Sequence, residues 1–260
     1  MISTGGLALD QAPPFHIPAR FFLTAPLFAV LAGLLLVWEG PSLLASRWMP
    51  PAVAATHLIA IGYLGQVMCG ALLQMLPVMV GAPVPAVRWV GALAHPLLTL
   101  GALGLAWGLW RGGSVILGLG ASVTGLGFLV FLIPVTLALT RARGEPGTRM
   151  ALRAAALALL VTVVLGLVLT GSLLGWVRLA EFTPWVDAHA AWGLLGWVGL
   201  LILGVAVQVI PLFYVTPPYP LLVRSWLAPT LLAGIFLGSL AGIHGWHLMA
   251  RLALGASAVG

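Results

Sequence analysis

Long apolar runs separated by short polar breaks make up most of this chain. A helix needs about 20 mostly apolar residues to cross the hydrocarbon core of a bilayer. Runs of about that length recur between prolines, glycines and arginines, which end helices or mark the membrane surface. They predict seven membrane-spanning helices at residues 21–38, 52–80, 89–110, 115–140, 151–176, 186–214 and 226–250. The pattern therefore predicts an all-α, polytopic membrane bundle that forms one domain over residues 1–260.

The last apolar run admits two interpretations. It forms one helix through Ala250, or it turns at Gly242–Gly245 and begins an eighth, truncated helix. A turn inside the membrane would leave backbone N–H and C=O groups without partners. We therefore favour the single helix.

Composition supports the membrane assignment and excludes two other classes. Hydrophobic residues make up 62% of the chain and charged residues 6%, whereas soluble domains carry roughly 25% charged residues. The net charge of +6 comes from arginines that stand between apolar runs. A nucleic-acid-binding face would need them clustered. The lipid bilayer is thus the expected environment, and the single cysteine, Cys69, excludes an intrachain disulfide.

The arginines also predict an orientation, because cytoplasmic loops carry an excess of basic residues. When the spans alternate, one side carries Arg20, Arg88, Arg141, Arg143, Arg149, Arg153 and Arg224, and the other Arg47, Arg111, Arg178 and Arg251. We expect the larger group, and with it the N-terminus, to be cytoplasmic.

The second and sixth predicted spans resemble each other. At one constant separation, equal to four predicted helices, the matching pairs are Gly62 and Gly196, Gly70 and Gly204, Gln74 and Gln208, and Pro77 and Pro211. Internal repeats are a recurring way to build large membrane proteins. A four-helix duplication is therefore one interpretation, and shared helix-packing needs are the other.

Three glutamines, Gln66, Gln74 and Gln208, lie within these spans. An amide exposed to lipid without a hydrogen-bond partner is costly. We expect all three to face the interior of the bundle.

Histidines carry the functional hypothesis. His57, His189, His244 and His247 all fall near the same end of their spans, whereas His95 enters from the opposite side. Three imidazoles from His189, His244 and His247 would suit a copper or zinc ion, and paired histidines would suit haem iron. The alternative for each histidine is a hydrogen bond to a neighbouring helix or to water at the interface. Asp187 is a loop charge or a partner that orients His189.

The stretch from His57 through Gly62, Tyr63, Gly70, Pro77 and Gly81 resembles NnrS-type haem- and copper-containing membrane proteins. The segment Pro14–Phe22 resembles the one that precedes their first helix. More distantly, the chain is similar to subunit I of haem–copper oxidases, in which helix two carries a haem ligand and helices six and seven carry copper ligands.

This resemblance implies a haem ligand at His57 and copper ligands at His189, His244 and His247. We therefore expect haem b, with His57 and His189 as the candidate cofactor-binding residues, and copper as a further candidate cofactor. It implies electron transfer or the handling of nitric oxide or another diatomic gas in a bacterial inner membrane. Catalytic residues, and whether the protein is an enzyme, stay open. Two other classes also stay open: a cofactor-free scaffold in a homo-oligomer or a larger membrane complex, and a small-molecule transporter.

Overall fold

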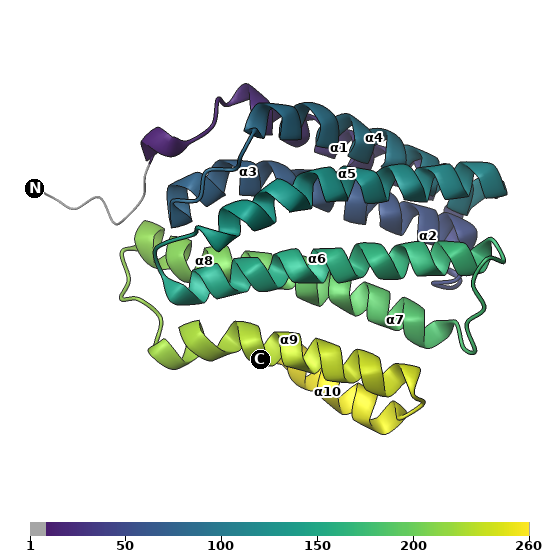
Figure 1. Cartoon of the computed structure of the whole chain (residues 1–260). Helices are drawn as coiled ribbons and strands as arrows, with labels where there is room; N and C mark the ends of the chain where they lie inside the picture. The colour runs from purple at the N-terminus through teal and green to yellow at the C-terminus, as the bar shows by residue number, and fades with distance from the viewer. Residues whose placement is uncertain (1–8, 260) are drawn as a thin grey trace, which may run out of the picture.

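The computed structural model of the protein describes residues 9–259, and long helices lie side by side in it (Figure 1). Seven helices are long and apolar enough to cross a membrane, and the described residues contain no strand. The expectation of an all-α integral membrane bundle is confirmed. These spans are His16–Leu44, Pro50–Val80, Val87–Arg111, Ser114–Thr140, Pro146–Leu173, Thr183–Tyr214 and Leu221–Ile243.

Some of the spans are built from more than one element. The first is α1 (His16–Glu39) extended by the 3-10 turn η2 (Gly40–Leu44). The third, fourth, fifth and seventh spans are the single helices α4 (Val87–Arg111), α5 (Ser114–Thr140), α6 (Pro146–Leu173) and α9 (Leu221–Ile243). The second and sixth spans are each composite.

Both composite spans contain a π-helical segment between two α-helices. The second span is α2 (Pro50–His57), η3 (Leu58–Gly65) and α3 (Gln66–Val80). The sixth is α7 (Thr183–Ala191), η4 (Trp192–Gly199) and α8 (Leu200–Tyr214). The two π segments stand at the constant separation that relates the paired glycines and glutamines. Because π-helices are rare and occur frequently at functional sites, their equivalent placement strengthens the repeat.

The expectation of one helix through Ala250 is wrong. α9 ends at Ile243, and α10 (His247–Val259) turns back alongside it (Figure 1). The turn leaves few backbone groups unpaired, because Trp246 N–H donates to Ala241 O and Gly245 N–H donates to Gly242 O. Gly245 has φ +76, which completes the Schellman arrangement that commonly ends helices.

Within the first half, the second span packs closely on α1 through two glycines. A Cβ atom on Gly62 would overlap the ring of Phe28. A Cβ atom on Gly70 would lie 3.0 Å from the Cβ of Phe21. Small residues let membrane helices approach in this way.

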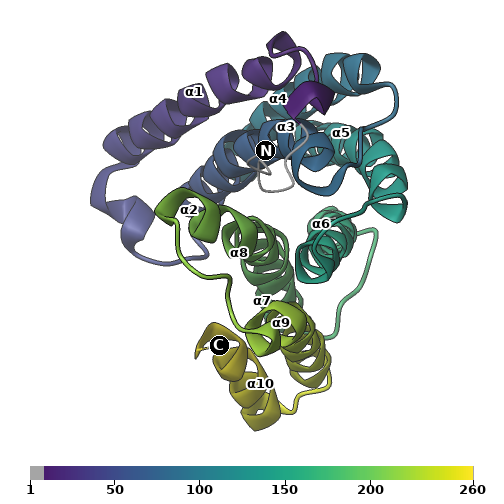
Figure 2. The same cartoon turned by 90° about the vertical axis from the view of Figure 1, so that its left-hand side faces the viewer.

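The second half repeats these contacts between the sixth span and α6. A Cβ on Gly196 would lie 2.8 Å from the Cβ of Ala158, and one on Gly204 would lie 2.8 Å from the Cβ of Ala151. Ala158 and Ala151 are separated as Phe28 and Phe21 are, but they stand four residues, about one helical turn, before the positions that the constant separation would match with Phe28 and Phe21. Figure 2 shows the outcome, with α1, α3, α4 and α5 in one group and α6, α8, α9 and α10 in another.

The glycine contact yields a matched pair of variants. Gly62→Ala should lower the melting temperature by several degrees, because overpacking a close contact typically costs about 1–3 kcal/mol. Gly33→Ala is the control, since no atom lies within 4 Å of a Cβ at that position of α1, and it should melt at or above the temperature of the parent. Thermal unfolding in detergent measures both, and equal melting temperatures would contradict the packing described here.

Candidate functional site

His57 and His189 meet where the two composite spans approach each other. Their ring centroids are 6.2 Å apart and their planes differ by 18°. His57 is the last residue of α2, directly before η3, and His189 lies in α7 just ahead of η4. The structure thus brings together two residues that are far apart in the sequence, one from each half.

Hydrogen bonds define the protonation of both rings. His57 Nδ1 lies 2.8 Å from Val53 O, and His189 Nδ1 lies 3.0 Å from Thr162 O. A backbone carbonyl only accepts, so Nδ1 carries the proton in each ring, and a neutral ring then presents a lone pair at Nε2. Among the described residues, no hydrogen bond reaches either Nε2 atom. Metal-binding histidines typically have this arrangement, in which the second nitrogen donates to a carbonyl or carboxylate.

A glycine on α6 makes room for one of the rings. A Cβ atom at Gly166 would lie 3.1 Å from Cε1 and 3.6 Å from Nδ1 of His189. The His189 ring therefore lies flush against the α6 backbone, four residues from the carbonyl of Thr162. Nothing in the sequence indicates the Thr162 carbonyl or Gly166 as parts of this site, because neither a backbone carbonyl nor a glycine has a sequence pattern that marks contact with a histidine.

Asp187 does not serve as the partner of His189. Its carboxylate accepts a hydrogen bond from Arg47 at 2.7 Å, and both side chains are about half exposed, at 58% for Arg47 and 45% for Asp187. Arg47 belongs to the first half and Asp187 to the second. This ion pair thus links the halves near the histidine pair, although exposed pairs contribute at most about 1 kcal/mol.

Of the other predicted metal ligands, the structure describes the side chain of His244 only. His244 is exposed at the end of α9, where its ring centroid lies 6.0 Å from that of Trp246. No three histidine, cysteine, aspartate or glutamate side chains lie close enough to hold a metal ion in the part of the chain that the structure describes. The side chain of His247 lies outside that part. His95 is engaged elsewhere, with Nε2 2.8 Å from Thr24 Oγ1.

The glutamines lie inside the bundle to different degrees. Gln66 is fully buried, with 0% exposure, and donates to Thr99 Oγ1 at 3.0 Å. Gln74 and Gln208 are partly buried. The Oε1 atoms of all three are buried and have no hydrogen-bond partner among the described residues.

Comparisons with known proteins identify no relative of this chain. A scan against protein-family models finds no matching family, and searches of the curated proteins and of the solved structures find no match.

The proximity of the two histidines can be tested with cysteines. In a Cys69→Ser background, the pair His57→Cys and His189→Cys should be cross-linked efficiently by a short bifunctional thiosulfonate, because the rings they replace are 6.2 Å apart. His57→Cys with His95→Cys is the control, since antiparallel spans two and three place those residues near opposite ends of the bundle. Mass spectrometry of the linked peptides measures the yield. Equal yields from both pairs would rule out the arrangement.

Proposed function

We propose that this membrane protein binds a metal centre, with haem b as the foremost group, and that His57 and His189 supply the ligands through Nε2. The observation that carries this proposal is the pair of imidazoles with both Nδ1 atoms committed to carbonyls. The two Nε2 lone pairs are then available to a donor, a shared proton or a metal cation. A metal ion suits them, because neutral imidazole is a common ligand of iron, copper and zinc.

The distance between the two ring centroids, but not the orientation of the rings, matches that of two ligands of one metal. A metal–nitrogen bond to histidine is about 2 Å long, and the ring centroid lies roughly 1 Å further on. Two imidazoles that share one metal would therefore have centroids about 6 Å apart, close to the observed 6.2 Å, but the rings here are stacked with planes 18° apart, so at least one ring would have to turn to aim its Nε2 atom at the metal. Paired histidines are an established ligation for haem iron, which the donor set here therefore suits.

The expected role is electron transfer, or the handling of nitric oxide or another diatomic gas, as the resemblance to NnrS-type proteins and to oxidase subunit I implies. A bound haem would supply one-electron chemistry. With both imidazoles as ligands, electron transfer is favoured over gas binding, because a gas would first have to displace one histidine. The chain's own residues orient the rings through Val53 O and Thr162 O.

The proposed orientation rests on the distribution of the arginines. Arg153 donates to Leu139 O at 2.8 Å, and Arg224 lies 3.5 Å from Glu145. These contacts support a common membrane surface for the larger arginine group. We propose that this surface is cytoplasmic, together with the N-terminus, in a bacterial inner membrane. A homo-oligomer or a larger membrane complex is the proposed assembly for an electron carrier without a large soluble domain in its described part.

A reduced-minus-oxidised visible spectrum, with iron and copper analysis on the same haem-supplied preparation, tests the proposal. The parent should give a b-type signal. His57→Ala and His189→Ala should each lower haem occupancy at least tenfold, because even partners that only orient a metal ligand contribute about 10–100-fold to metal affinity. His95→Ala is the control and should keep the signal, since Thr24 already engages its Nε2.

Two results would overturn the proposal. One is a folded parent protein without iron or copper. The other is equal haem content in the parent and in both histidine variants. Stoichiometric partner subunits in a preparation without a chromophore would favour the scaffold instead.

A further inference from the structure

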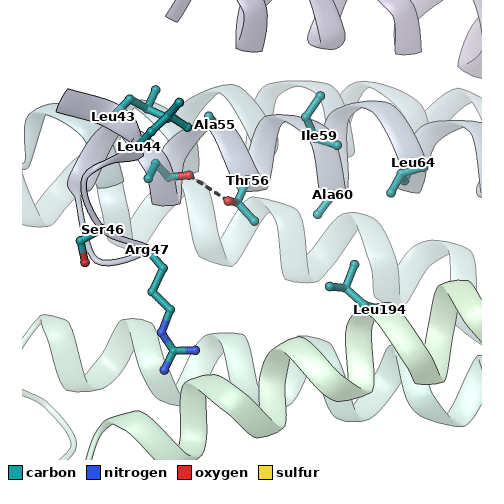
Figure 3. A pocket seen from close by; sticks show the side chains of 11 residues that line it. Leu43, Leu44, Ser46, Arg47, Ala55, Thr56, Ile59, Ala60, Leu64 and Leu194 are labelled. Carbon is teal, nitrogen blue, oxygen red and sulfur yellow. Dashed lines mark hydrogen bonds between the residues drawn. The ribbon is translucent and has the colours of Figure 1, made fainter. Parts of the chain in front are cut away.

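A groove of about 480 Å³ runs along the surface where the two halves meet (Figure 3). Its floor belongs to the second span, and one wall residue, Leu194, comes from η4 of the sixth span. The residues that line it are Leu43, Leu44, Ser46, Arg47, Ala52, Ala55, Thr56, Ile59, Ala60, Leu64 and Leu194. All but three of them are apolar, and the polar ones gather toward one end.

Small side chains on one face of the second span create the hollow. Ala52, Ala55 and Ala60 form much of the floor. Thr56 donates its hydroxyl to Ala52 O at 2.8 Å, so its hydrogen-bonding capacity is met within its own helix. From Ala52 to Leu64 the floor extends at most about 18 Å, because the π-helical segment η3 rises less per residue than an α-helix. That length is close to one leaflet, which is half of a hydrocarbon core about 30 Å thick.

The polar end of the groove carries a cation. Arg47 reaches from this end toward the second half (Figure 3). Its guanidinium lies 4.5 Å from the ring centroid of Trp48, and one nitrogen, Nη1, bonds to Asp187. A guanidinium has five N–H donors, so donors remain for a second anion. Arginine binds phosphate oxygens in this planar, often bidentate manner.

We infer that the groove holds one phospholipid, with an acyl chain along the floor from Ala52 to Leu64 and its phosphate beside Arg47. Three observations agree with this occupant: the length of one leaflet, the apolar lining and the cation, Arg47, at one end of the groove. The lipid would touch both halves, through Leu194 and through the Arg47–Asp187 pair. A second copy of the chain fits less well, because a stable protein interface buries at least about 1,000 Å². This inference does not depend on a metal at His57.

Retention of lipid after detergent washing, measured by native mass spectrometry, tests the apolar part of the site. The parent should keep one phospholipid per chain. Ala60→Phe, which fills the floor, should lower the retained fraction about tenfold. Ala92→Phe is the matched control, because Ala92 is an exposed alanine on α4 outside the groove. An unchanged elution volume and melting temperature would show that Ala60→Phe still folds.

The charged end is tested by two further variants. Arg47→Gln should lower retention about tenfold. Asp187→Asn removes the same ion pair but keeps the cation, and it should retain lipid at least as well as the parent. Equal losses in both variants would overturn the phosphate contact, because the ion pair alone would then account for them. The inference is also overturned if Ala60→Phe retains as much lipid as Ala92→Phe. Recovery of an isoprenoid quinone or of a second protein chain in place of phospholipid would overturn it as well.

Discussion

The absence of water in the bilayer core is the constraint on which this structure depends, because every backbone N–H and C=O group there must find a partner within the protein. Helices meet that requirement along their length, and their ends need other partners. Arg153 reaches back to Leu139 O at the end of α5, and Arg143 N–H donates to Val80 O at the end of α3. The Gly245 turn solves the same problem between α9 and α10. Pairing of this kind permits a turn that length and hydropathy alone argued against.

Packing divides the molecule into two similar halves with a less uniform boundary. Within each half, the composite span approaches its neighbour at a pair of glycines, so the contacts leave little space. Along the boundary between spans two and six, the structure instead has two facing imidazoles, an exposed ion pair and an apolar groove. The glycine contacts occur in both halves, whereas the contacts between the halves are of several different kinds. His57 and His189 do not occupy equivalent positions of the repeat.

The two π-helical segments, η3 and η4, begin close to His57 and His189 in the sequence. A π turn holds more residues than an α turn, so it changes the rotation of everything that follows it. Counting 100° per residue from His57 therefore misplaces the residues beyond η3. The side chain of His57 bonds to Val53 O immediately before this change of geometry, and η4 begins soon after His189. Both rings thus lie where the helices depart from regular geometry, in segments that could adjust to a bound group.

Run length and composition by themselves determined the membrane class and the seven spans, because the bilayer imposes one length and one pairing rule on every crossing. Glutamines and histidines within apolar spans also marked the candidate interior and site residues. Only the tertiary structure decided that His57 meets His189, that His244 stands apart and that Asp187 pairs with Arg47. It also decided that the chain turns at Gly245. The reason is physical: which side chains meet depends on helix rotation, close glycine contacts and backbone carbonyls such as Thr162 O, and none of these has a signature in the order of residues.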